Sequence, residues 1–161
     1  MRLKYTALYI GLIVLVNYAF TVVPLIELPD GTKWPPVALL VGFVFVARDF
    51  AQREIGHKVL LAMLAGVALS YVMADPFVAT ASAAAFLVSE LVDWAVYTFT
   101  KRPLSQRVLL SSLFGAPLDS VVFLGIVGIL TPAGAIAMTA SKLLGATIVW
   151  WLIRRREQTL A

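Results

Sequence analysis

Six ionisable residues stand inside long apolar stretches of the sequence, where charged side chains are rare. They are Arg48, Asp49, Glu90, Asp93, Asp119 and Lys142. A charge at the centre of a bilayer costs about 2.5–3.5 kcal/mol even on the mildest scale, so such residues face the interior of a helix bundle and mark function. Four acids against two bases leave two negative charges in excess. That excess requires protonation, a cation or a ligand rich in hydrogen-bond donors, which predicts a polar binding cavity.

Helical spacing places these residues on common faces. Two stripes with steps of three and four residues occur, one of Phe86, Glu90, Asp93 and Tyr97, and one of Ser112, Ala116, Asp119 and Phe123. At about 1.5 Å of rise per residue, four of the charges fall in one slab, from mid-membrane toward the cytoplasmic side: Arg48, Glu90, Asp119 and Lys142. The charges therefore converge from several helices at comparable depth.

Buried ion pairs that hold helices together are the plainer interpretation of the same residues. Arg48 pairs naturally with Glu90 or Asp93, and Lys142 pairs naturally with Asp119. Two bases leave two of the four acids without a counter-charge. Ion pairing alone therefore does not account for the carboxylates as a set.

Composition decides the class of protein that carries these charges. Of 161 residues, 61% are hydrophobic and 14% charged, whereas soluble domains have about 45–50% and about 25%. This excludes an ordinary soluble enzyme and a disordered tail. Without cysteine and with one histidine, His57, the chain lacks the ligands for iron–sulfur, thiolate zinc and multi-histidine metal sites, so no metal or cofactor is expected.

Six apolar segments have lengths near the ~20 residues that cross a bilayer as a helix. They span residues 5–23, 35–52, 57–74, 76–99, 108–130 and 133–153, and the third is short and ends at Asp75-Pro76. Pro35 and Pro76 stand at segment starts, where a missing N–H is tolerated. The sequence therefore predicts an all-α integral membrane protein, a single domain over residues 1–161 with six transmembrane helices.

Basic residues between the segments indicate the orientation. With the N-terminus inside, ten of them fall on the inner side: Arg2, Lys4, Arg53, Lys58, Lys101, Arg102, Arg107, Arg154, Arg155 and Arg156. Only Lys33 falls outside, a strong positive-inside bias. Both termini are therefore expected in the cytoplasm. Because the basic residues lie in short clusters between apolar runs, the net charge of +4 indicates membrane flanks and not nucleic-acid binding.

Catalytic signatures are missing from the chain. His57 is not deep enough to pair with a buried serine, and no His-Glu-x-x-His motif occurs. No arginine ladder or selectivity filter is present either. Polar residues that converge on a cavity from several helices fit a transporter and not an enzyme.

Four motifs in order along the chain resemble one family. They are Val46–Phe50 (VARDF), Ser89–Asp93 (SELVD), Ser112–Ser120 (SLFGAPLDS) and the pair Ser141-Lys142. Together they resemble the VUT family of vitamin uptake transporters, also called queuosine precursor transporters, over about residues 40–153. This family is similar in fold to the six-helix substrate-binding components of energy-coupling-factor vitamin transporters. The resemblance implies uptake of 7-cyano- and 7-aminomethyl-7-deazaguanine across the bacterial inner membrane.

The resemblance also carries over a set of substrate-binding positions: Arg48, Asp49, Glu90, Asp93, Asp119, Ser120 and Lys142. A guanine-like edge offers adjacent N–H donors that one carboxylate accepts in bidentate fashion. Glu90 is the residue predicted for this role, with Asp93 and Asp119 as alternatives. The carbonyl of the base would take a hydrogen bond from Lys142 or Arg48.

An aromatic face is expected to sandwich the ring of such a base. The candidates from the sequence are Trp94, Tyr97 and Phe114. An aminomethyl group, which is cationic, would use the second surplus carboxylate.

Three hypotheses for the function follow. The first is a self-sufficient secondary transporter, proton-coupled through a buried carboxylate, with a deazapurine and the lipid bilayer as its partners. The second is the substrate-binding component of an energy-coupling-factor complex, docked through the small residues Ala7 and Gly11. The third is a non-transporting membrane scaffold. A homo-oligomer and the identity of any coupling partner are left open.

Overall fold

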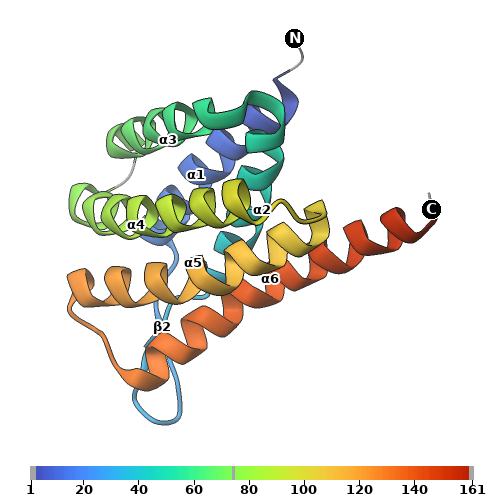
Figure 1. The fold of residues 1–161 in the computed structure, drawn as a ribbon. Coiled ribbons are helices and arrows are strands. Elements are labelled where there is room, and N and C mark those ends of the chain that lie inside the picture. The colour runs from blue at the N-terminus through green and yellow to red at the C-terminus, as the bar shows by residue number, and fades with distance from the viewer. Residues whose placement is uncertain (1–2, 74, 160–161) are drawn as a thin grey trace.

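The structure is a computed structural model that describes residues 3–73 and 75–159, with side chains described up to Arg155. Six helices and one short hairpin dominate it (Figure 1). The elements are α1 (Lys4–Val22), β1 (Ile26–Glu27), β2 (Lys33–Trp34), α2 (Ala38–Ile55), η1 (Gly56–Lys58), α3 (Val59–Met73), α4 (Pro76–Thr100), α5 (Leu104–Val127) and α6 (Pro132–Thr159). The six helices follow the six predicted segments, and their ends differ by a few residues.

Local chemistry explains where these helices begin and end. The Asp75 carboxylate accepts hydrogen bonds from the backbone N–H groups of Phe77 and Val78, at 3.0 and 3.1 Å, and so caps α4 directly before Pro76. α6 continues beyond the predicted end at residue 153, to Thr159. α5 begins at Leu104, four residues before the predicted segment, and remains helical through Pro117.

Five stretches of the described residues are long and apolar enough to cross a membrane. One of them, Ala38–Met73, contains α2, η1 and α3 together, because α3 has only 15 residues. The chain nevertheless turns between α2 and α3 at Gly56, whose φ of 60° and ψ of −137° are accessible to glycine. The structure thus confirms an all-α membrane protein, while six crossings and the orientation of the termini remain predictions.

The outer surface of the bundle is apolar. Leu61, Val72 and Ile136 are exposed at 66%, 84% and 70%. So much exposed hydrophobic surface is unfavourable in water and favourable against lipid chains.

Close packing of α2 and α6 brings two of the buried bases into one interior. A Cβ atom on Gly42 would overlap the backbone carbonyl of Lys142, and one on Gly145 would lie 3.1 Å from the carbonyl oxygen of Leu39. Small residues permit this approach of two helix backbones. By contrast, α3 packs mainly beside α1, away from α5 and α6 (Figure 1). The site is therefore built from the other five helices.

Candidate functional site

Arg48 on α2 is at the centre of the first charged cluster and is fully buried. Its Nε donates to Glu90 Oε2 on α4 at 3.0 Å, and its Nη1 pairs with Asp49 Oδ1. Tyr9 of α1 donates to the same Glu90 oxygen at 2.9 Å, and Ser111 of α5 donates to Asp49 Oδ2 at 3.1 Å. Four helices thus meet at one guanidinium, and of the two partners predicted for Arg48, Glu90 and Asp93, it is Glu90 that forms the ion pair.

Lys142 on α6 forms the second cluster. Its Nζ pairs with Asp119 Oδ2 on α5 and donates to Ser120 Oγ at 3.1 Å. Lys142 has no exposed surface, and Asp119 has 5%. This is the second pairing expected from the sequence. Beside it, Trp34 of β2 donates its indole N–H to Ser141 Oγ at 3.0 Å, which ties the hairpin to the same helix.

Asp93 lies between these clusters without a counter-charge of its own. It is fully buried, and within the described part of the chain neither carboxylate oxygen has a hydrogen-bond partner. Its charge interacts with those of Arg48, Glu90, Asp49 and Asp119. An unpaired carboxylate at this depth is costly unless it binds a proton or a ligand that donates hydrogen bonds.

Two further oxygens near Asp93 lack partners among the described residues. They are Glu90 Oε1, one turn earlier on α4, and the Ser112 hydroxyl on α5. Gly115, one turn after Ser112, lies directly against the Asp93 carboxylate. The site therefore contains several buried oxygen atoms without a hydrogen-bond partner among the residues that the structure describes. The glycine at position 115 provides the space that the Asp93 carboxylate occupies.

A small closed cavity adjoins the second cluster, in the half of the bundle nearer the hairpin. Residues from α1, α2, α4, α5 and α6 line it, among them Asn17, Ser82, Phe86, Asp119 and Phe123. Its volume is about 20 Å³, which is room for one water molecule. A larger ligand fits only after the helices have moved apart.

One comparison with known proteins bears on this arrangement. The model of a family described as Putative vitamin uptake transporter matches residues 4–155. The chain belongs to this family. Comparisons with curated proteins and with solved structures gave no match.

Membership of the vitamin uptake transporter family agrees with the resemblance noted in the sequence, and the structure brings all seven carried-over positions into one interior. All seven are buried: Arg48, Asp49, Glu90, Asp93, Asp119, Ser120 and Lys142. Within the described residues, no group of three or more acidic or histidine side chains has the arrangement of a metal site.

The three aromatic residues considered for stacking lie in different parts of the structure. Tyr97 is buried, with its ring centroid 6.0 Å from the Arg48 guanidinium and 4.9 Å from that of Arg107. Trp94 is half-buried and donates its indole N–H to His57 Nδ1 at 3.0 Å. Phe114 is 53% exposed and lies on the outside of the bundle. Only Tyr97 thus contacts the Arg48 cluster.

Several polar residues that lie in the interior were not predicted from the sequence. Tyr9 and Ser111 complete the Arg48 cluster, and Asn17 and Ser82 line the cavity. A signal for two of them was available, because Asn17 and Tyr9 are polar groups within an apolar segment. The helices that they contact depend on how α1 is rotated, which the sequence of a single helix does not encode.

Proposed function

We propose that this protein imports a planar deazaguanine base, 7-cyano- or 7-aminomethyl-7-deazaguanine, through a binding site inside the helix bundle. It acts in the bacterial inner membrane as a transporter without enzymatic activity. The observation that carries the proposal is the excess of buried acceptors around Asp93. A guanine-like edge supplies the adjacent N–H donors that these acceptors lack.

Asp93 is the best candidate to accept the two N–H groups of the base. Both of its oxygens are unpaired, whereas Glu90 has only Oε1 without a partner and Asp119 gives Oδ2 to Lys142. This assigns to Asp93 the role that the sequence suggested for Glu90. Glu90 Oε1 is then the second acceptor, suited to an aminomethyl cation.

The two bases complete the recognition of the substrate. Lys142 lies beside Asp119, which lines the cavity, so it is well placed to donate to the carbonyl of the base once the helices separate. Arg48 is engaged with Asp49 and Glu90 and therefore orients the acceptors. Asp49 and Ser120 support these two bases in turn.

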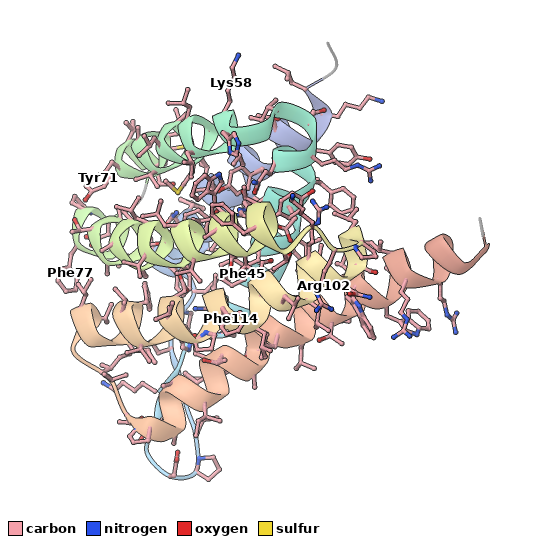
Figure 2. The ribbon with its side chains drawn as sticks, in the orientation of Figure 1. Phe45, Lys58, Tyr71, Phe77, Arg102 and Phe114 are labelled. Atoms are coloured by element: carbon pink, nitrogen blue, oxygen red, sulfur yellow. The ribbon has the colours of Figure 1, made fainter. Side chains whose placement is uncertain are left out.

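Charge distribution supports a topology of six crossings with both termini in the cytoplasm. Lys58 and Arg102 lie toward one end of the bundle, and Tyr71 and Phe77 lie at the opposite end (Figure 2). The chain has no cysteine, so single cysteines introduced at Lys33 and Lys101 report sidedness directly. An impermeant thiol reagent added to intact cells is expected to label K33C and not K101C; the reverse labelling would overturn the orientation.

The transport proposal is tested with purified protein in liposomes that contain no other subunit. We expect uptake of labelled 7-cyano- or 7-aminomethyl-7-deazaguanine by the wild type and at least a tenfold loss in Asp93→Asn. The amide presents an N–H to the donor edge of the base and leaves one acceptor instead of two. Glu27→Gln, an exposed carboxylate on β1, is the matched control. Wild-type uptake by Asp93→Asn would overturn the site.

The second candidate function is that of a substrate-binding component that depends on the other subunits of an energy-coupling-factor complex. It is favoured because one face of α1 is not covered by any other described helix. Ala7 and Gly11 are exposed, and no atom of another element approaches the position of a Gly11 Cβ within 4 Å. Co-purification with ATPase subunits, together with substrate binding but no transport in liposomes, would support this candidate. A protein that binds no base in either setting would instead fit the scaffold hypothesis.

A further inference from the structure

Two phenylalanines stand one helical turn from two of the buried carboxylates. Phe86 precedes Glu90 by four residues on α4, and Phe123 follows Asp119 by four residues on α5. Residues four apart lie above one another on a helix face. Both rings are buried and line the same closed cavity. The two rings that line the cavity therefore lie next to the carboxylates of Glu90 and Asp119 on their helices.

Each ring contacts a second aromatic residue, which belongs to α1. Tyr9 stacks on Phe86 with ring centroids 6.4 Å apart and 26° between the ring planes. Phe20 contacts Phe123 with centroids 4.9 Å apart. Because Tyr9 is itself held by Glu90, the position of the Phe86 ring is coupled to the carboxylate cluster.

Asn17 of α1 adds a further polar group to this cavity, which Ser82 and Asp119 also line. Its Nδ2 donates to the Ile13 carbonyl and to Ser70 Oγ, at 3.0 and 3.1 Å, which determines the direction of the amide. Its Oδ1 is buried and has no partner among the described residues. Asn17 is 6% exposed and lines the cavity. A buried acceptor of this kind requires a donor, from a water molecule or from a ligand.

We propose that Phe86 and Phe123 form the stacking cleft for a planar bicyclic base and that Asn17 Oδ1 accepts one of its N–H groups. The inference rests on the proposed function and makes it more specific. It assigns ring recognition to residues other than Trp94, Tyr97 and Phe114. The cleft is too small for a base in this structure, so a base enters it only when the helices separate.

The cleft predicts a selectivity that hydrogen bonding alone does not produce. Isocytosine has the same donor edge as the deazaguanines, but it has a single ring and therefore a smaller stacking face. Stacking of a base on an aromatic side chain contributes enough for a preference of about tenfold or more. We therefore expect the wild type to bind 7-cyano-7-deazaguanine at least about tenfold more tightly than isocytosine.

Calorimetric titration of the detergent-solubilised protein with both compounds tests the cleft. Phe123→Leu and Phe86→Leu keep an apolar side chain and remove the ring, so each is expected to reduce the preference to about threefold or less, with little change for isocytosine. Phe123→Tyr keeps the ring and is expected to retain the preference. Phe114→Leu removes an exposed ring and is the matched control.

The outcomes separate the cleft from the function on which it rests. If the wild type binds neither compound, the proposed function fails, and the cleft with it. If it binds both and Phe123→Leu and Phe86→Leu retain the full preference, the cleft fails alone. A second measurement needs no variant, since stacking lowers the near-ultraviolet absorbance of a bound base. An unchanged spectrum on binding to the wild type would also overturn the cleft.

Discussion

The carboxylate of Asp93 on α4 lies so close to Gly115 on α5 that any side chain at position 115 would overlap it. A residue with only a hydrogen atom as its side chain thus makes room for a fully buried acid. This contact sets the distance between two helices at the site, and it links the packing of the bundle to the position of its unpaired carboxylate.

Gly115→Ala is therefore expected to displace Asp93 and to reduce base binding at least tenfold. Overpacking of this kind costs about 1–3 kcal/mol, so the thermal unfolding midpoint in detergent should also fall. Gly125→Ala on the same helix is the matched control, because a Cβ there meets Leu130 at 3.9 Å, an ordinary contact. Normal binding in Gly115→Ala would mean that the exact position of Asp93 is unimportant.

The Lys142–Asp119 pair separates a binding role from a purely structural one. Lys142→Met leaves Asp119 buried without its partner, and breaking such a pair costs about 3–5 kcal/mol. The double variant Lys142→Met/Asp119→Leu removes both charges and is expected to recover most of that stability. Uptake should remain lost in both variants. Thermal unfolding and liposome uptake are measured on the same preparations.

Lys33→Met, at an exposed lysine of the hairpin, controls for the loss of a positive charge. Uptake at the wild-type rate by the stable double variant would support the scaffold interpretation of these charges. Equal instability of the single and double variants would show that the ion pair is not what holds α5 to α6.

The hairpin is expected to loosen when its link to α6 is removed. Trp34→Phe and Ser141→Ala each abolish the hydrogen bond from the indole N–H to the hydroxyl. Hydrogen exchange of the backbone amides in residues 26–34 should increase several-fold in both variants. Because the two substitutions remove the same bond, their effects should not add in the double variant. Additive effects would show that each residue acts through other contacts.

Glu54 holds the beginning of α1 from the end of α2. Its Oε2 accepts hydrogen bonds from the backbone N–H and the hydroxyl of Thr6, at 2.9 and 2.7 Å, and its charge is favourable at a helix N-terminus. Glu54→Ala is expected to lower the unfolding midpoint by about 2–4 °C and to leave base binding unchanged. Glu27→Ala on the exposed hairpin is the control, and a change in base affinity would contradict this purely structural role.

The positions of the helices were predictable from the sequence because their causes are local. Apolar segments of about 20 residues determine a helix in lipid, and Asp75 with Pro76 determines where α4 starts. α3 begins two residues after its predicted start, since its 15 helical residues follow a separate turn at Gly56–Lys58. That turn depends on the backbone conformation of Gly56, which the hydrophobic pattern does not reveal.

The sequence by itself determined which charges are buried and, by their signs, that Lys142 pairs with Asp119 and Arg48 with Glu90 or Asp93. Tertiary structure alone decided which acid remains unpaired. Glu90 and Asp93 are three residues apart on one helix, about 60° around its axis, so a small rotation of α4 decides which of them meets Arg48. The contact of Gly115 with Asp93 and the hydrogen bond from Tyr9 to Glu90 set that rotation, and the second of these joins helices that are far apart in the chain.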